Sequence, residues 1–226
     1  MPYSSQMTYC GLATMPEREE LAIKTIASIS PQVDRMFVVF NEYKKIPAWV
    51  DSFPNVEPYC GSGKWGDAAK FMFVDFCDGY YFSIDDDLIY PPTYVEDMIE
   101  AIDNHDCIVS LTGKWYGSLP VYNWRTDFSV RVHCLKDWVE NVIVHVGGTG
   151  VMAFHTDFFD LKFTDFKRKN MADIWVAKVA HEQDVPIMAL PHKANYLKYQ
   201  KPSGKTIWEK NEDKQYITDL LNSFLK

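Results

Sequence analysis

The stretch 80–92, with the sequence YYFSIDDDLIYPP, constrains the fold more than any other part of the chain. Aromatic and β-branched residues precede three acids, Asp85 to Asp87, and predict a buried strand that ends where the acids begin. Pro92 and the helical spacing of the apolar residues after it predict a helix over 93–103. The three carboxylates therefore lie at the carboxyl end of a strand, where open α/β sheets bind their ligands.

Three adjacent carboxylates repel one another unless a cation joins them. A hard divalent cation with oxygen ligands suits this position. We therefore expect Asp85 and Asp87 to serve a site for Mn²⁺ or Mg²⁺, with Asp87 as the more direct ligand. Asp85 contacts either the metal, through water, or a ribose. The simpler alternative is an acidic turn that is exposed to water.

Composition bounds the class of protein. The chain has 226 residues, of which 47% are hydrophobic, enough for one sizeable core. Its net charge of −8 argues against a nucleic-acid partner, which requires a basic face. The five cysteines have no CxxC spacing, which favours reduced thiols. We find no signal peptide and no run long enough for a transmembrane segment, and we expect a cytoplasmic protein.

Strand and helix patterns alternate along the chain, which predicts a single α/β domain with a mixed sheet, a parallel core and flanking helices. Two alternating stretches, 129–135 and 142–146, are expected to pair as an antiparallel addition to the parallel half. Further helices are predicted over 68–76, from 170 onward and over 206–226. No internal repeat or domain linker interrupts this pattern.

Polar residues follow the first two predicted strands. Thr14 and Glu17 have the spacing of a capping box at the start of a helix. Arg18, in the first turn of that helix, either reaches a phosphate or a base or remains a solvated charge. Asn41 directly follows the second predicted strand, the apolar stretch 36–40.

Glycine-rich turns provide the remaining features at the predicted strand ends. The stretch 60–67 opens onto a helix that carries Lys70, either in the same cleft or on the surface. Residues 147–150 permit close approach of the backbone to a ligand. Asp173 lies in the first turn of a helix, where acids are common for electrostatic reasons, and His192 follows a strand end, either as a ligand or as a structural histidine. A diphosphate would be bound by these groups together: the acids with a metal ion, the basic side chains and the glycine turns, all on one rim of the sheet. The metal ion neutralises the charge of the diphosphate as it leaves.

These motifs resemble the GT-A glycosyltransferases, which transfer sugars from nucleotide sugars and have a Rossmann-like first half. The sequence SIDDD at 83–87 is similar to their DxD motif, and the stretches 14–18, 66–71, 148–150 and 172–173 follow in the family's order. The resemblance implies a metal-dependent, family-2-like enzyme over 1–226, with a nucleotide-binding half (1–111) and an acceptor-binding half (112–226). The chain is either a whole protein or one domain of a larger enzyme.

The resemblance also implies roles for single residues. Asp173 would be the general base of an inverting transfer, and His192 would be a third metal ligand beside Asp85 and Asp87. Asp67 can accept the imide N–H of uracil, so a UDP-sugar is the expected donor and a carbohydrate or glycoconjugate the expected acceptor. The donor is expected to contact Thr14, Arg18, Asn41, Asp67, Lys70, Asp85, Asp86, Gly148 and Gly150.

Three other functions compete with glycosyl transfer. A nucleotidyltransferase also places acids and Mg²⁺ on an α/β sheet, but the first βα turn here lacks a glycine-rich nucleotide loop. An aspartyl phosphatase would have its DxD on the first strand. A non-catalytic sugar-binding domain of the same fold is the non-enzymatic alternative. Turnover of a nucleotide sugar separates these classes.

Overall fold

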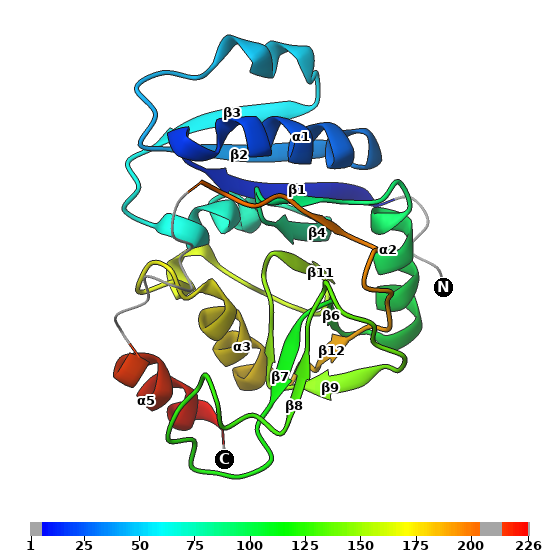
Figure 1. Cartoon of the computed structure of the whole chain (residues 1–226), viewed down its shortest axis with the longest axis vertical. Helices are drawn as coiled ribbons and strands as arrows, with labels where there is room; N and C mark the ends of the chain where they lie inside the picture. Colours follow the sequence, from blue (N-terminus) through cyan, green and yellow to red (C-terminus); the bar gives the residue numbers. More distant parts are fainter. Residues whose placement is uncertain (1–5, 204–213, 226) are drawn as a thin grey trace.

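A mixed sheet of eight strands forms the centre of the protein, in the order β3-β2-β1-β4-β11-β6-β12-β9 (Figure 1). The computed structural model describes residues 6–203 and 214–225. The strands of this sheet are β1 (Met7–Thr14), β2 (Arg35–Asn41), β3 (Val56–Gly61), β4 (Gly79–Ile84), β6 (Ile108–Ser110), β9 (Val142–Val144), β11 (Val151–His155) and β12 (Ile187–Ala189).

Two small sheets accompany the large one. The first has the order β10-β7-β8 and the second joins β13 to β5. Their strands are β5 (Leu88–Ile89), β7 (Gly113–Trp115), β8 (Val130–Val132), β10 (Val146–Gly147) and β13 (Lys198–Tyr199). The α-helices are α1 (Glu19–Ile29), α2 (Tyr94–His105), α3 (Ala172–Glu182) and α5 (Lys214–Phe224). Short 3-10 helices are η1 (Pro16–Arg18), η2 (Ser30–Gln32), η3 (Ala48–Ser52), η4 (Gly66–Phe71), η5 (Val74–Phe76) and η6 (Phe163–Asp165).

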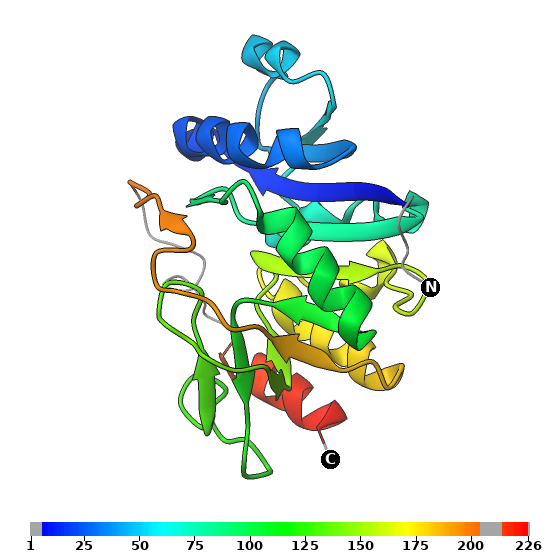
Figure 2. The ribbon, with the colours of Figure 1, turned by 90° about the vertical axis from the view of Figure 1, so that its right-hand side faces the viewer.

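Helices cover both faces of the large sheet. Ile26 of α1 and Met98 of α2 belong to one buried cluster with β1 and β4, and Figure 2 shows both helices on this side. Trp175 of α3 and Leu221 of α5 belong to a second cluster on the other face. The strand β2 is buried from its second residue to its last, because a strand with both faces covered excludes water on each side.

The order of strands fixes the position of the ligand rim. β1 lies between β2 and β4 and is parallel to both. The chain first adds β2 and β3 on one side of β1 and then adds β4 on the other side. Such a switch point leaves a crevice at the carboxyl ends of the two central strands, which is where open sheets bind ligands. Here these ends are Thr14 and Ile84, directly before the acidic triplet.

The fold class predicted from the sequence is confirmed, but two details of it are wrong. The stretches 129–135 and 142–146 do not pair with each other: β8 pairs with β7, and β9 pairs with β12. The reason is that β7, which is not among the strands predicted above, supplies the partner of β8. The helix predicted over 68–76 consists of the 3-10 helices η4 and η5.

The C-terminal part of the chain continues over the same face as α1. Gln200 donates hydrogen bonds from Nε2 to the Leu21 carbonyl and to Thr25 Oγ1, so the segment after β13 lies against α1 (Figure 2). Residues 204–213, which include part of the helix predicted over 206–226, lie outside the described residues. None of the helices in the described part of the chain combines the length and hydropathy that crossing a bilayer requires.

Candidate functional site

Asp86 ties the two central strands together at the switch point. Thr14 Oγ1, at the end of β1, donates a hydrogen bond of 2.8 Å to Asp86 Oδ2. Arg18 Nη1 lies 2.6 Å from Asp86 Oδ1. Burial lowers the pKa of Arg18, but the charge and hydrogen bond of Asp86 outweigh this effect and raise it, so the guanidinium stays charged. Both oxygens of Asp86 are therefore engaged within the protein.

The backbone of the acidic turn is held from both sides. Thr25 Oγ1 on α1 lies 3.0 Å from the Asp86 carbonyl and 2.7 Å from the Leu88 carbonyl. The Tyr90 hydroxyl accepts a hydrogen bond from the Asp85 amide and donates one of 2.5 Å to the Gly150 carbonyl. These bonds fix the direction in which Asp85 and Asp87 leave the strand end.

Lys70 reaches the acidic triplet from η4. Its Nζ lies 2.7 Å from Asp85 Oδ1, and the side chain of Lys70 is 3% exposed whereas that of Asp85 is 49% exposed. Burial opposes the charged ammonium, but the charges of Asp85 and Asp67 outweigh burial and raise the pKa of Lys70. Lys70 is thus a buried cation that neutralises one accessible carboxylate.

Asp87 is the least compensated acid of the triplet. Arg18 Nη1 is 3.4 Å from Asp87 Oδ2, farther than from Asp86. Burial, together with the charges of Asp85 and Asp86, raises the pKa of Asp87 to about 7. Asp87 is thus a largely buried carboxylate beside two other acids, and an additional cation would lower its pKa.

These acids fit a metal ion that is bound together with a phosphate ligand. The described residues contain no group of three or more His, Cys, Asp and Glu side chains that could hold a metal ion. Asp85 and Asp87 each keep one carboxylate oxygen that no described group hydrogen-bonds, whereas both oxygens of Asp86 are engaged. Mg²⁺ is commonly held by one or two carboxylates, with phosphates and waters completing the shell. The raised pKa of Asp87 agrees with this kind of site.

His192 does not join the acids. Its Nδ1 lies 2.8 Å from the Leu190 carbonyl and its Nε2 lies 3.2 Å from the His133 carbonyl, so both ring nitrogens face backbone oxygens. His192 follows β12, which is three positions from β4 in the sheet, a separation of about 14 Å at the usual strand spacing. The structure therefore gives His192 a structural position in place of the predicted third metal ligand.

Asp67 lies at the start of η4, the element that also carries Lys70, and Asn41 contacts the same start. Asn41 Nδ2 donates a hydrogen bond of 3.1 Å to the Gly66 carbonyl, which positions the start of η4. Asp67 Oδ2 accepts a hydrogen bond from the Ala172 amide, and its Oδ1 is buried without a hydrogen-bond partner among the described residues. Burial raises the pKa of Asp67 to about 6. An unsatisfied buried oxygen of this kind suits a donor group on a ligand.

Asp173, in the first turn of α3, is held by Thr149. The Thr149 amide and hydroxyl both donate to Asp173 Oδ1, at 2.8 Å and 2.6 Å. The Thr149 carbonyl in turn accepts a hydrogen bond of 2.7 Å from Ser83 on β4. The charge of Asp173 acts on both Lys70 and Asp67. No described group hydrogen-bonds Asp173 Oδ2, so one oxygen of a rigidly placed carboxylate remains available.

The glycines beside Thr149 allow this close arrangement. A Cβ on Gly150 would lie 2.0 Å from Asp85 Oδ2, and a Cβ on Gly148 would lie 2.8 Å from the Thr112 Cβ. Any larger residue at position 150 would displace Asp85 from its present position. The glycine-rich turn after β10 thus packs directly against the acidic triplet, a close approach that the absence of a side chain permits.

Most of the predicted site residues lie on this rim, and one local prediction is wrong. Thr14 does not cap a helix, because Met15 is the residue that precedes η1 and no side chain caps it; the Thr14 hydroxyl bonds Asp86 instead. Ser83, Tyr90 and Thr149 were missed by the sequence analysis. The one signal in the sequence was a serine, Ser83, at the end of an apolar strand. The hydrogen bonds from Ser83 to Thr149 and from Tyr90 to Gly150 join residues 60 positions or more apart, which no local pattern reveals.

Comparison with known proteins defines the fold but not a family. No protein-family model matches the chain, and no curated protein matches it. Among solved structures, the chain is similar to a nucleotidyl transferase from Methanothermobacter thermautotroptrophicus. The TM-score is 0.50 and the identity 11%, over 83% of this chain and 88% of the other. At this identity the likeness concerns the fold alone.

Proposed function

We propose that the protein is a metal-dependent glycosyltransferase that moves a sugar from a nucleotide sugar to an acceptor hydroxyl with inversion. One observation carries this proposal: Lys70 Nζ lies 2.7 Å from Asp85 Oδ1, and Asp67, in the same 3-10 helix as Lys70, accepts a hydrogen bond from the amide of Ala172, which directly precedes Asp173. Carboxylates from three separate elements therefore come together near the switch point of the sheet. This arrangement provides acids for a leaving diphosphate and a separate acid for an acceptor.

The leaving-group side is formed by Asp85, Asp87 and Lys70. Asp85 and Asp87 would hold a Mn²⁺ or Mg²⁺ ion, which supplies charge that neutralises the diphosphate when it is bound. Lys70 is positioned to add a further positive charge. Thr14 and Arg18 support this site by fixing Asp86, a more indirect role than the direct nucleotide contact expected from the sequence.

The nucleotide base is assigned to the region beside the start of η4. Asp67 Oδ1 has no partner within the described residues and would accept the imide N–H of uracil. Cytosine has no N–H at that position, so the donor of choice is a UDP-sugar. Asn41 positions the same region by binding the carbonyl of Gly66.

Asp173 is assigned as the general base. As the bond between C1 of the sugar and the acceptor oxygen forms, the acceptor hydroxyl passes its proton to Asp173 Oδ2. The bond between C1 and the phosphate oxygen breaks, and its electron pair leaves with the nucleoside diphosphate. A carboxylate held through its other oxygen by Thr149 is positioned for this proton transfer.

A second candidate function is nucleotidyl transfer. It is favoured by the likeness in fold to a protein described as a nucleotidyl transferase, and the same acidic rim suits a nucleoside triphosphate. In that reaction a sugar phosphate attacks the α-phosphate and pyrophosphate leaves, so an acid in the position of Asp173 has no hydroxyl proton to remove. The two functions differ in their products.

One assay distinguishes these functions. The protein is incubated with a panel of nucleotide sugars, with Mn²⁺ or with EDTA, and the release of nucleoside diphosphate is measured; a parallel panel of nucleoside triphosphates and sugar phosphates is assayed for pyrophosphate. We expect diphosphate release from a UDP-sugar that requires the metal and is lost in Asp87→Asn. Pyrophosphate release alone identifies nucleotidyl transfer. Binding of nucleotide sugars without either product identifies a non-catalytic domain.

A further inference from the structure

The small sheet β10-β7-β8 places two cations side by side. Lys114 on β7 and Arg131 on β8 are direct partners in the antiparallel register, so their side chains leave the same face of the sheet, about 5 Å apart at Cβ. Like charges in such opposed positions destabilise a sheet. A protein with a net charge of −8 thus keeps an unfavourable pair of positive charges at this position.

Aromatic rings hold these cations in place. Lys114 Nζ lies 4.4 Å from the ring centroid of Trp124 and 5.5 Å from that of Phe128. The guanidinium of Arg131 lies 5.7 Å from the Phe128 ring, and that of Arg125 lies 5.3 Å from the Trp124 ring. We call these five residues the cationic cluster. Cation–π contacts orient the positive groups but leave their charge in place.

The charges within the cluster act on one another. The pKa of Lys114 is lowered from 10.5 to about 8, because burial, the largest cause, and the charges of Arg131 and Arg125 outweigh the charge of Asp173, which raises it. Arg131 is exposed, and within 6–203 and 214–225 no carboxylate lies within ion-pair distance of it. An anion bound at this face would relieve the repulsion.

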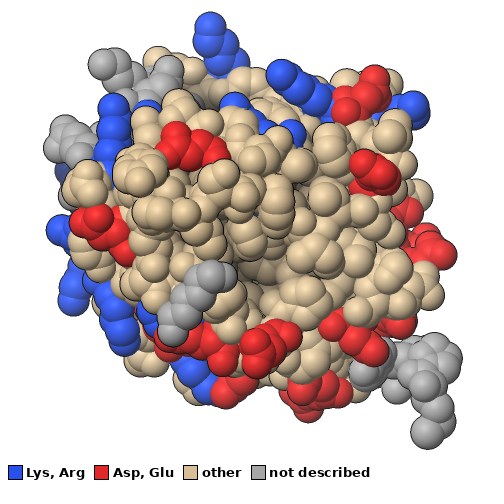
Figure 3. All heavy atoms as spheres, turned by 90° about the horizontal axis from the view of Figure 1, so that it is seen from below, with Lys and Arg blue, Asp and Glu red and all other residues tan. Residues whose placement is uncertain are grey.

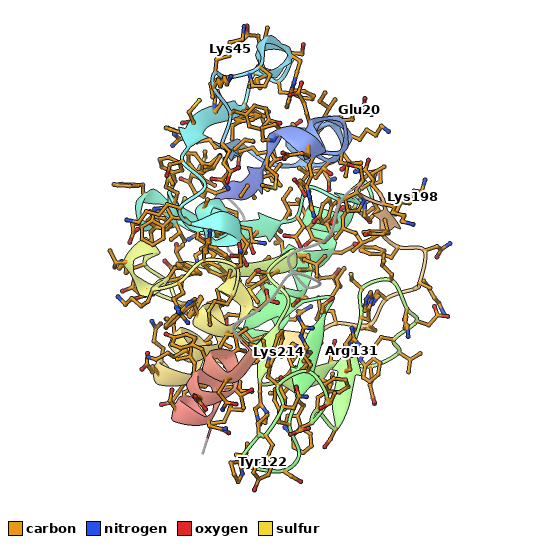
Figure 4. The ribbon with its side chains drawn as sticks, turned by 60° about the vertical axis from the view of Figure 1, so that its left-hand side comes forward. Glu20, Lys45, Tyr122, Arg131, Lys198 and Lys214 are labelled. Carbon is orange, nitrogen blue, oxygen red and sulfur yellow. The ribbon has the colours of Figure 1, made fainter. Side chains whose placement is uncertain are left out.

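The cluster lies next to the proposed general base. Lys114 is paired on its other side with Val146 of β10, and β10 leads directly into the turn whose Thr149 binds Asp173. Figure 4 shows Arg131 on the small sheet, with Tyr122 at the tip of the loop below it and Lys198 above. Seen from the end that carries α5, the surface is mostly uncharged and hollowed near its middle (Figure 3).

We propose that the acceptor is an anionic saccharide, and that Lys114 and Arg131 bind its phosphate or carboxylate group while Asp173 takes the proton of its hydroxyl. This inference rests on the proposed function and adds the chemical class of the acceptor. Arg131 supplies a fork of N–H donors that matches an oxyanion, and Lys114 supplies a point charge. The rings of Trp124 and Phe128 fix the two cations before the ligand arrives, which reduces the entropy lost on binding.

The test compares three sugars that differ in charge: glucose, glucose 6-phosphate and glucuronic acid. Their binding to the full chain is measured by ligand-observed NMR in the presence of UDP and Mg²⁺. We expect at least one anionic sugar to bind about tenfold or more tightly than glucose, since charged hydrogen bonds contribute this much. The two anionic sugars distinguish a phosphate from a carboxylate as the bound group. We expect 0.5 M NaCl to reduce the difference.

Two variants and one control assign the effect to the cluster. Arg131→Gln and Lys114→Gln should each remove most of the preference for charge. Lys45→Gln, which removes an exposed lysine at the far end of the molecule (Figure 4), should keep it. Equal binding of the three sugars, no binding of any of them, or a preference that survives in both cluster variants would overturn the proposal.

The same samples separate this inference from the proposed function. Diphosphate release from a UDP-sugar is measured with water and with each of the three sugars as acceptors. Turnover without a preference for charge overturns the anionic acceptor and leaves glycosyl transfer standing. A charge preference in binding without any turnover of nucleotide sugars overturns glycosyl transfer and leaves the anion site standing.

Discussion

Lys70 and Asp85 form an ion pair of 2.7 Å in which the cation is buried and the carboxylate is half exposed. Because the ammonium is shielded from water, it depends on Asp85 for its charge, and the second oxygen of Asp85 lies against Gly150. This pair links the core of the protein to the proposed diphosphate site. A change at Lys70 should therefore affect both the stability of the fold and the binding of UDP, and each effect can be measured.

We expect Lys70→Met to lower the melting temperature of the protein, because the loss of one partner of a buried ion pair leaves the neighbouring carboxylates without their cation. The same change should weaken the binding of UDP with Mn²⁺ by about tenfold or more, since one charged contact is lost. Calorimetric titration with UDP and a melting curve test both parts. An unchanged UDP affinity would remove Lys70 from the diphosphate site; Lys45→Gln is the matched control.

Asp86→Asn should destabilise the fold more than a change at either neighbouring acid. The substitution leaves Arg18 without its buried partner and weakens the bond to Thr14. We expect a loss of about 3 kcal/mol in the free energy of unfolding, the lower end of the range for a broken buried pair. Urea denaturation measures it, with the exposed Asp51→Asn as control. A stable Asp86→Asn that no longer responds to Mn²⁺ would instead identify Asp86 as a metal ligand.

Asp67 should make stability depend on pH. Its folded pKa is raised from 3.8 to about 6, so the folded state binds the proton more tightly than the unfolded state. The stabilisation by the protonated form is present below about pH 4 and is lost as pH rises through 6, with a total on the order of 3 kcal/mol. Asp67→Asn should remove this loss and so be the more stable protein at pH 7.5, as measured by melting curves between pH 4.5 and 7.5. An identical pH profile in both proteins would contradict the shift.

Asp173→Asn should abolish turnover while the protein folds normally. The asparagine carbonyl can still accept both bonds from Thr149, but Nδ2 replaces the oxygen that takes the proton. Loss of a general base typically lowers the rate by about a hundredfold to ten thousandfold. Steady-state kinetics measure this loss, and UDP binding by calorimetry should remain as in the wild type. The anomeric configuration of the product, observed by NMR, is an independent check: retention would leave Asp173 without this role.

His192→Gln should leave the metal dependence of the reaction unchanged. Both ring nitrogens face backbone carbonyls, so the substitution disturbs packing next to β12 and should lower the melting temperature. The measurement is the Mn²⁺ concentration at half-maximal activity. A large increase in that concentration would return His192 to the metal site.

Much of the rim could be predicted from the sequence, because each strand ends where its apolar run ends. Asp85 to Asp87 and Thr14 follow such runs, and both positions lie on the rim. Residues in the long connections were harder to assign. Lys114 belongs to a strand of three residues, too short for periodicity to separate from the surrounding loop, and its partner Arg131 is 17 positions away along the chain. Contacts of this kind depend on strand pairing, which no local pattern specifies.

Asp173 illustrates the same limit in another form. An acid in the first turn of a helix is common for electrostatic reasons alone, so its place in the sequence could not separate catalysis from helix stabilisation. The bonds from Thr149 to Asp173 join two elements across 24 positions, and Ser83 joins Thr149 to β4 across 66. Only the assembled sheet brings these three side chains together.

The insertion of β11 between β4 and β6 has a consequence for how the chain is made. Both neighbours of β11 belong to the first 111 residues, yet β11 itself covers Val151–His155. A nascent chain that has emerged only as far as β6 still lacks β11, the strand that lies between β4 and β6 and pairs with both. The large sheet therefore closes late in synthesis, and the two halves of the chain should gain their native structure only when both are present.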